Sequence, residues 1–251
     1  MIRIDALLSP AEQGLLADRS LAQTACVVFD VLRATTTLLE MLAQGAEGIR
    51  PVSEISEAVA LRRADPNLLL AGERHGLRIH AGISGGIDFD FGNSPREVRR
   101  DRVEHRTVAM TTTNGTRALK ACHGASAIWV AAFTNLDTTA RNLIASGSKE
   151  ILLVCSGTGA DVAFEDVLGA GALADRLLSL NPSAQLGDAA STALATYRLH
   201  RHDLLKSLQS ASNARRLLGI PDLAADVPAC LELDRHTFAA SMGSDGVVRR
   251  H

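Results

Sequence analysis

Two charged side chains follow the first long apolar run of the chain and could act together on a phosphate group. Asp30 comes directly after residues 25–29, and Arg33 stands three residues further on. A carboxylate in this place could bind Mg²⁺ or attack phosphorus as a nucleophile. A guanidinium could form paired hydrogen bonds with a phosphate or a carboxylate. The structural alternative is that Asp30 caps a helix and forms an ion pair with Arg33.

The pairing of a carboxylate with a guanidinium recurs after a second apolar run. Glu73 and Arg74 follow residues 68–71, and Asp90 is a third acidic candidate further along the chain. The eight histidines show no His-x-x-x-His spacing, so the candidate metal ligands are carboxylates alone. Oxygen ligands of this kind suit a hard cation such as Mg²⁺ better than zinc.

The stretch 107–115 changes abruptly from apolar strand residues to hydroxyls, an amide and a glycine, and a helix-like segment follows it. A helix N-terminus presents backbone N–H groups and the positive end of the helix dipole, which favours an anion. The stretch therefore predicts a phosphate site formed by Thr112, Thr113, Asn114, Gly115 and Arg117. The alternative is that the threonines finish a strand and Asn114-Gly115 forms an ordinary turn.

A glycine-rich loop follows another apolar run near residue 155. A cysteine-dependent phosphatase needs an arginine six residues after its cysteine, but Asp161 stands at that distance from Cys155. The loop also lacks the third glycine of a dinucleotide-binding fingerprint, and no Gly-Lys-Ser/Thr occurs in the chain. Two interpretations are left open, an anion-binding nest or a structural turn, for Cys155, Ser156 and Gly157.

Strands that alternate with helices must position these groups. Apolar runs predict strands at 25–29, 49–52, 68–71, 108–110, 128–130 and 151–154, and helical patterns fill most of the segments between them. The alternation predicts an α/β fold with a largely parallel or mixed sheet and helices on both faces, and the region from 188 onward shows helical patterning. Ligands of such sheets bind beyond the carboxyl ends of the strands, where all the candidate motifs stand.

The bulk properties exclude several classes of protein. A chain of 251 residues can form a single α/β unit or two lobes, about 1–105 and 106–251. With 26 Lys and Arg against 28 Asp and Glu, and 3% aromatic residues, we expect no nucleic-acid partner. The four cysteines form no Cys-x-x-Cys pair, and no apolar run approaches the ~20 residues that span a bilayer. We therefore expect a reduced, cytoplasmic protein without a membrane partner, for which a homo-oligomer is compatible with the sequence.

The order of the motifs resembles the 2-phosphosulfolactate phosphatase family, the ComB-like proteins. The matching stretches are 27–37, 71–77, 90–95, 111–119 and 155–157, with a weaker match at 222–234. The resemblance implies an α/β fold with two related lobes. It also implies a Mg²⁺-dependent enzyme that hydrolyses the phosphate ester of 2-phospho-3-sulfolactate to 3-sulfolactate and phosphate. One departure from the family pattern is a set of extra residues around 80–86.

The resemblance also implies roles for individual residues. Catalysis is expected from Asp30, Arg33, Glu73 and Arg74, and Mg²⁺ binding from Asp30, Glu73 and Asp90. Substrate binding is expected from Asn93 and Ser94 together with the hydroxyl-rich and glycine-rich loops described above. Arg33, Arg74 and Arg117 would face the three anionic groups of the substrate. The attacking group, water or a carboxylate, is left open.

Two rival hypotheses are consistent with the same residues. The first is a phosphatase for another small phosphorylated carboxylic acid, since an anion site of this kind does not by itself select the sulfonate. The second is a non-catalytic anion-binding protein of the same fold, which would bind without releasing phosphate. A comparison of substrates and a measurement of phosphate release distinguish these hypotheses.

Overall fold

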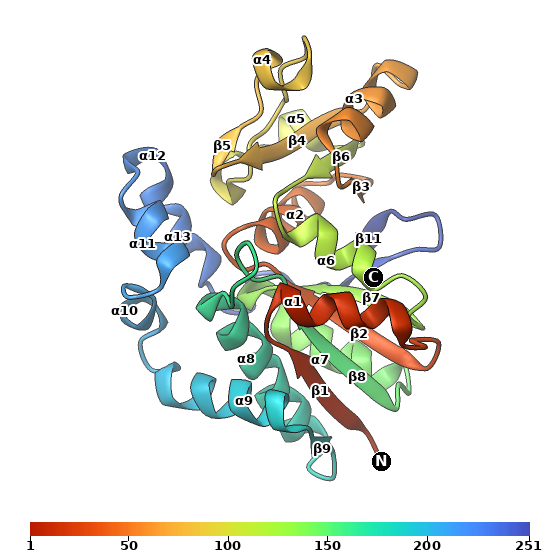
Figure 1. Ribbon diagram of the computed structural model, residues 1–251, viewed down its shortest axis with the longest axis vertical. Coiled ribbons are helices and arrows are strands. Elements are labelled where there is room, and N and C mark those ends of the chain that lie inside the picture. The colour runs from red at the N-terminus through yellow and green to blue at the C-terminus, as the bar shows by residue number, and fades with distance from the viewer.

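The computed structural model describes residues 1–251 with the exception of the Leu15 side chain. Across these residues, eleven strands form one sheet in the order β5-β4-β6-β3-β11-β10-β7-β2-β8-β1-β9 (Figure 1). The strands are β1 Arg3–Leu7, β2 Thr24–Phe29, β3 Gly48–Pro51, β4 Leu69–Arg74, β5 Leu77–Arg78, β6 Thr107–Thr111, β7 Ala127–Ala131, β8 Glu150–Cys155, β9 Gln185–Leu186, β10 Ala240–Met242 and β11 Val248–Arg250. The predicted α/β class with a mixed sheet is confirmed.

The C-terminal hairpin joins two parallel halves of the sheet. One half contains β3, β4 and β6, and the other contains β1, β2, β7, β8 and β9, all paired in parallel. The antiparallel strands β10 and β11 lie between them, since β11 pairs with β3 and β10 pairs with β7. The last strands of the chain therefore connect the two parallel halves into one continuous sheet.

Helices connect the strands and then form most of the C-terminal region. They are α1 Pro10–Gln13, α2 Ala34–Ala43, α3 Ile55–Ala64, α4 Ala81–Ser84, α5 Arg100–Val103, α6 Gly115–Ala121, α7 Leu136–Ala145, α8 Phe164–Leu180, α9 Asp188–His200, α10 Leu204–Leu208, α11 Ser212–Leu218, α12 Pro221–Ala224 and α13 Asp226–Cys230. Short 3₁₀ helices are η1 Gly14–Asp18, η2 Pro95–Glu97 and η3 Phe133–Asn135. The predicted helical region after residue 188 is confirmed as far as Cys230, but the strands β10 and β11 follow it. Figure 1 shows α10–α13 beside the sheet at the left.

Side chains of the central strand β2 explain why helices cover both faces of the sheet. Val27 and Phe29 belong to an apolar cluster that includes residues of α7, α8 and α9. Cys26 and Val28 point the other way, into a cluster with residues of α2 and α6. Successive side chains of a strand face opposite sides, so a strand buried on both faces needs a continuous apolar run. The run at residues 25–29 meets this need.

Parallel register brings the carboxyl ends of the strands to common levels. Phe29 lies beside Ala131 and Cys155 in one half, and Gly72 lies beside Thr111 in the other. The polar residues that follow these positions therefore leave the sheet at the same edge, as the sequence predicts.

The predicted lobe boundary near residue 105 does not coincide with a division of the sheet. Strands from 1–105 and from 106–251 occur in both parallel halves, because β2 pairs with β7 and β8 while β3 and β4 pair with β6. The related lobes stay a prediction. Residues 76–92 are rich in glycine and show no helical pattern, which predicts a loop, but they contain two short elements, β5 and α4. The extra residues 80–86 include α4, at the top of Figure 1.

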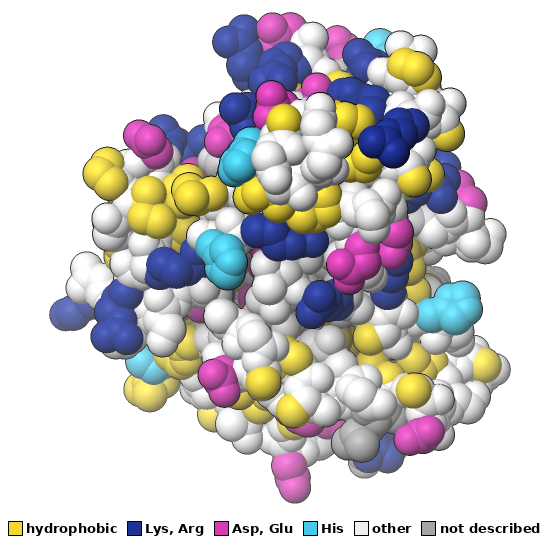
Figure 2. All heavy atoms as spheres, turned by 45° about the horizontal axis from the view of Figure 1, so that its top comes forward, with side chains coloured by type: hydrophobic (Ala, Val, Ile, Leu, Met, Phe, Trp, Pro, Cys, Tyr) yellow, Lys and Arg dark blue, Asp and Glu magenta, His cyan; other side chains and the backbone are white. Residues whose placement is uncertain are grey.

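Two further expectations concern cysteines and membranes. The four cysteines are free and buried, as predicted for a reduced chain. Within the described residues, no helix combines the length and the apolar character needed to cross a membrane. Figure 2 shows acidic and basic side chains mixed over the face in view, which matches the nearly balanced charge of the sequence.

Candidate active site

A cavity of about 330 Å³ opens where the strand ends of both halves meet the C-terminal helices. Its lining includes many of the residues predicted from the sequence, namely Asp30, Arg33, Glu73, Arg74, Asn93, Thr112, Thr113 and Asn114. It also includes residues that the sequence reasoning did not select as site residues, namely Leu32, His75, Gly76, Thr158, Gly159, Asn213 and Arg216. The central spatial expectation, that strand ends far apart in the sequence share one cavity, is met.

Asp30 follows β2 directly and is 8% exposed. Its Oδ1 atom accepts a hydrogen bond at 3.1 Å from the N–H of Ala34, the first residue of α2. The N-cap position is Arg33, which forms its ion pair with Asp226 and not with Asp30. Burial raises the pKa of Asp30 to about 7, and repulsion from Glu73 and Glu165 adds to this effect, whereas hydrogen bonds from the N–H groups of Ala34 and Gly115 oppose it. Asp30 can therefore hold or release a proton near neutral pH.

Gly115 supports Asp30 and does not line the cavity. Its N–H group donates to the Asp30 carboxylate, so that donor is already used within the protein. A Cβ atom at position 115 would lie 2.6 Å from Oδ2 of Asp30 and 2.7 Å from Cβ of Ala34. Glycine is therefore required for α6 to approach the end of β2 so closely.

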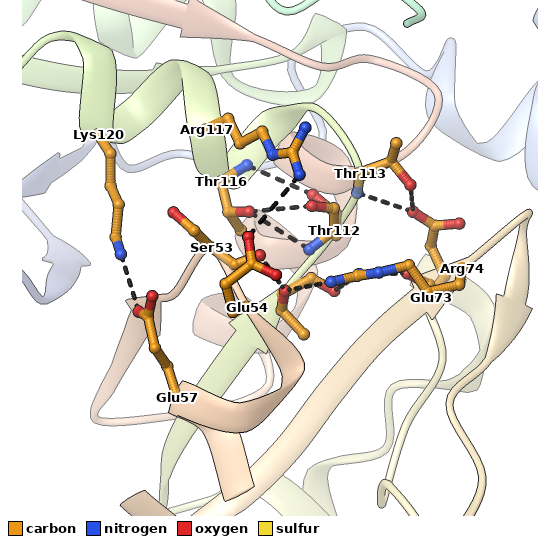
Figure 3. A network of polar contacts seen from close by, with 11 residues as sticks. Ser53, Glu54, Glu57, Glu73, Arg74, Thr112, Thr113, Thr116, Arg117 and Lys120 are labelled. Atoms are coloured by element: carbon orange, nitrogen blue, oxygen red, sulfur yellow. Dashed lines mark hydrogen bonds and ion pairs between the residues drawn. The ribbon is translucent and has the colours of Figure 1, made fainter. Parts of the chain in front are cut away.

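Glu73 joins the end of β4 to the turn after β6. Its Oε1 atom accepts hydrogen bonds from the N–H and the hydroxyl of Thr113, at 3.0 and 2.8 Å (Figure 3). Its Oε2 atom accepts a hydrogen bond from the Gly76 N–H at 2.6 Å. These contacts fix the turn at Gly76 relative to the turn at Thr113, on two sides of the cavity. Glu73 is therefore a positioning group as well as a candidate metal ligand.

Arg33 is held in place by a carboxylate that the sequence analysis did not identify. Its Nη1 atom lies 2.5 Å from Oδ2 of Asp226, and its Nη2 atom donates to the Gly76 carbonyl at 3.0 Å. Asp226 is fully buried, and its Oδ1 atom accepts a hydrogen bond from Ser94 at 2.7 Å. Ser94 thus lies behind the cavity and does not line it. The weak family match at 222–234 is the only signal in the sequence for Asp226.

Arg74 and Asn93 line other parts of the wall. The guanidinium of Arg74 donates to the Glu73 carbonyl at 2.7 Å and to the Thr111 hydroxyl at 3.1 Å. Asn93 is buried, and its Oδ1 atom has no hydrogen-bond partner among the described residues. Because buried polar atoms are normally paired, this oxygen is available to a ligand or a water molecule in the cavity.

Arg117 lies outside the cavity, which corrects the expectation that it contacts a phosphate there. Its side chain is 63% exposed, and its Nη2 atom lies 3.8 Å from Oε1 of Glu54. Figure 3 shows Arg117 and Lys120 of α6 directed at Glu54 and Glu57, whereas Thr113 faces Glu73. The third residue of α6 points toward the start of α3, because successive helix residues are rotated by about 100°.

The loop after β8 lines the cavity with residues further along the chain than the predicted ones. The Cys155 side chain is fully buried in an apolar cluster, and burial raises its pKa, with Asp166 adding to the shift. Ser156 is also buried, and the Gly157 N–H donates to Oδ2 of Asp166 at 3.0 Å. None of Cys155, Ser156 and Gly157 lines the cavity, whose wall begins at Thr158. Their structural interpretation therefore fits better than an anion-binding nest.

Asp90 also lies away from the cavity. Its Oδ2 atom lies 2.6 Å from Nη2 of Arg62 and accepts a hydrogen bond from the Leu70 N–H at 2.8 Å. The predicted metal set is therefore not assembled in full. Among the described residues, no group of three or more His, Cys, Asp or Glu side chains has the arrangement of a metal site. Only Asp30 and Glu73 of the predicted set line the cavity.

Two more buried carboxylates stand behind Asp30. Oδ1 of Asp166 accepts a hydrogen bond from the Val31 N–H at 2.8 Å, and Glu165 accepts one from Nδ2 of Asn213 at 2.9 Å. Burial raises the pKa of both groups, and Asp30 is the second cause for Asp166. A local excess of buried acidic groups is stabilised either by protonation or by a nearby cation.

Asn213 and Arg216 are the two unpredicted wall residues that come from a helix. They stand one turn apart on α11, far from any strand end, so an argument based on strand ends could not select them. Nδ2 of Asn213 also donates to the Thr158 hydroxyl at 2.6 Å. Asn213 and Thr158 also line a second cavity of about 330 Å³, whereas Arg216 lines the main cavity alone.

Taken together, the fold and the cavity define an α/β protein in which strand ends and a C-terminal helix line one cavity with arginines and carboxylates in its wall. The chain matches the 2-phosphosulpholactate phosphatase family over residues 12–242. A curated relative from Deinococcus radiodurans, named "Probable 2-phosphosulfolactate phosphatase", is 40% identical over 87% of this chain and 87% of its own. A relative of the same name from Caldicellulosiruptor saccharolyticus is 35% identical over 87% of this chain and 89% of its own. A relative of the same name from Prochlorococcus marinus (strain MIT 9303) is 35% identical over 89% of this chain and 91% of its own. The chain belongs to the 2-phosphosulfolactate phosphatase family, and thus to the phosphoric monoester hydrolases.

Proposed function

We propose that this enzyme hydrolyses the phosphate ester of 2-phospho-3-sulfolactate and releases 3-sulfolactate and inorganic phosphate. The observation that supports this proposal best is the meeting of three arginines, Arg33, Arg74 and Arg216, with Asp30 and Glu73 in one cavity. The substrate has a phosphate, a sulfonate and a carboxylate on three neighbouring carbon atoms. A site for it needs several guanidinium groups, which bind such oxyanions through charge-assisted hydrogen bonds. The names of the relatives agree with this substrate.

We further propose that Mg²⁺ is the cofactor and that Asp30 and Glu73 hold it. Mg²⁺ commonly binds through one or two carboxylates, with water and substrate phosphate oxygens as its other ligands. The two carboxylates of the cavity fit this pattern without Asp90. When bound, the cation would neutralise charge on the phosphate and make phosphorus more electrophilic. Burial, with a smaller contribution from repulsion by Glu73 and Glu165, raises the pKa of the Asp30 carboxyl to about 7, and a cation beside these groups would stabilise their ionised forms.

The residues of the chain have distinct tasks in this reaction. Arg33 and Arg74 bind oxygen atoms of the phosphate and stabilise the charge that develops on them. Either water or the Asp30 carboxylate attacks phosphorus, and the bond between phosphorus and the ester oxygen breaks. The ester oxygen takes a proton and leaves as the hydroxyl of 3-sulfolactate. In the carboxylate route, water then releases phosphate from Asp30, so both routes consume one water molecule in total.

A panel of substrates tests this proposal. At a fixed Mg²⁺ concentration, phosphate release is compared for 2-phospho-3-sulfolactate, phospholactate, phosphoglycolate and phosphoglycerate. We expect the highest kcat/KM for 2-phospho-3-sulfolactate. A preference for an ester without the sulfonate would replace the proposal with the first rival hypothesis. Binding of every ester without release of phosphate would favour the non-catalytic rival.

A further inference from the structure

The three arginines of the cavity differ in their partners. Arg33 is buried and is held by Asp226 and by the Gly76 carbonyl. Arg216 is exposed, and its guanidinium contacts only neutral oxygens, the carbonyl of His75 and Oδ1 of Asn213, both at 3.3 Å. Burial raises the pKa of Glu165 and the charge of Arg216 opposes this shift, but no carboxylate among the described residues lies within 4.0 Å of the guanidinium. Arg216 can therefore form a close ion pair with an anion in the cavity.

The backbone near residue 76 is shaped to receive the Arg216 side chain. A Cβ atom at Gly76 would lie 2.4 Å from Nη1 of Arg216, so a larger residue would displace the guanidinium. Gly76 has a φ angle of +84°, which L-amino acids with a side chain rarely adopt. The same residue donates to Glu73 and accepts from Arg33. Arg216 is thus located beside the reacting groups although it comes from a different part of the fold.

Arg216 reaches this region from a different wall of the cavity than the groups expected to act on the phosphate. Asp30, Glu73 and the 112–114 turn come from strand ends, and chemistry at phosphorus must take place beside these carboxylates. Arg216 enters from α11, on the wall formed by the C-terminal helices. A substrate with its phosphate at the strand ends would direct another anionic group toward α11.

Resting on the proposed function, we propose that Arg216 binds the sulfonate of the substrate and determines the preference for a sulfonated ester. The three equivalent oxygens of a sulfonate offer an acceptor in any rotation about the carbon–sulfur bond. A sulfonate therefore suits the guanidinium of Arg216, whose orientation is held by only two hydrogen bonds, both 3.3 Å long. A carboxylate offers two oxygens in one plane, which require a guanidinium of fixed orientation.

The test combines substitution of Arg216 with removal of single groups from the substrate. Three esters are compared: 2-phospho-3-sulfolactate, phospholactate, which lacks the sulfonate, and the phosphate ester of 2-hydroxyethanesulfonate, which lacks the carboxylate. For Arg216→Gln, we expect kcat/KM to fall about 10- to 100-fold more for the two sulfonated esters than for phospholactate, as for a lost hydrogen bond to a charged group. Arg216→Lys keeps the charge and is expected to give a smaller loss with the same substrate pattern.

Arg215→Gln is the matched control, because Arg215 is the neighbouring exposed residue of α11 and does not line the cavity. It is expected to leave the ratio of kcat/KM between substrates as in the wild type. An equal loss by the Arg216 variants on all three esters would overturn the inference, as would a loss that depends on the carboxylate. If the wild type hydrolyses none of the sulfonated esters, the proposed function fails instead, so the two failures are distinguishable.

Discussion

The Nη1 atom of Arg33 lies 2.5 Å from Oδ2 of Asp226, and both side chains are buried although 193 residues separate them in the chain. The contact links the loop after β2 to the start of α13. A buried charge is tolerated only when it is paired, so each of these two groups requires the other. This ion pair therefore fixes the C-terminal helices over the strand ends and orients a guanidinium in the cavity.

Asp226→Asn should weaken both activity and stability. Breaking a buried ion pair by removing one charge costs about 3–5 kcal/mol, and Arg33 would lose its fixed orientation. We expect kcat/KM to fall at least about tenfold, with a lower midpoint of thermal unfolding. Asp222→Asn, an exposed change on α12, is the control and should do neither. Normal kinetics in Asp226→Asn would mean that the orientation of Arg33 is unimportant for turnover.

Arg74→Gln should lower kcat/KM, whereas Arg117→Gln should leave it nearly unchanged. Arg74 lines the cavity, so loss of its charge should lower kcat/KM by about 10- to 100-fold. Arg117 faces Glu54 at the surface, and an exposed ion pair of this kind contributes about 0–1 kcal/mol. Steady-state kinetics of both variants test this contrast. Equal losses would show that the phosphate site extends to α6, as the sequence alone predicts.

Native activity should resist alkylation of thiols. The four cysteines are buried, and burial raises the pKa of the Cys155 thiol, so little thiolate is available for reaction. We expect iodoacetamide to leave the activity of the folded enzyme unchanged, whereas the unfolded chain incorporates the reagent. Rapid inactivation together with labelling of Cys155 would reopen a thiolate mechanism.

Stability without a metal ion should fall as the pH rises. The pKa of Asp30 is raised from 3.8 to about 7 by burial, so the folded state retains a proton that the unfolded state has already lost. The contribution of protonated Asp30 to the free energy of unfolding is therefore complete below about pH 4 and is lost as the pH rises through about 7. One pKa unit corresponds to about 1.4 kcal/mol, so the loss amounts to a few kcal/mol.

Thermal unfolding of chelator-treated protein measures this effect. Between about pH 5 and about pH 8, the wild type should lose more stability than Asp30→Asn, which has no carboxyl group to titrate at this position. Parallel stability curves for the two proteins would show that Asp30 is ionised in the folded state throughout this range.

Local sequence patterns predicted much of the fold because they depend on neighbouring residues. The apolar runs at 25–29 and 151–154 lie within β2 and β8, and the pattern of residues 55–64, which predicts a helix, corresponds to α3. The spacing of Thr134 and Asp137 predicts a capping box at the start of the next helix. This prediction is wrong, since the N-cap of α7 is Asn135 and the Thr134 hydroxyl has no partner among the described residues. The hydroxyl of a threonine can bond in several local geometries, and its type alone does not select one.

The part of the site that is formed by residues at strand ends was predictable from the sequence. Asp30 follows β2, Glu73 lies at the end of β4 and Thr113 follows β6. Parallel register aligns the strand ends within each half of the sheet, and all three residues line the same cavity. Asp226 and Arg216 come from helices whose position depends on packing against distant elements, so no local pattern identifies them. Arg117 shows the opposite case: it stands beside the correct turn in the sequence, but the rotation of α6 directs it away from the cavity.

The decisive measurement for the proposed hydrolysis is release of inorganic phosphate from 2-phospho-3-sulfolactate. We expect the wild type to release one phosphate for each ester consumed, a chelator to stop the reaction, and added Mg²⁺ to restore it. Asp30→Asn should release none while circular dichroism shows an intact fold. The proposed hydrolysis fails if the wild type binds the ester without releasing phosphate, and the proposed role of Asp30 fails if Asp30→Asn is fully active.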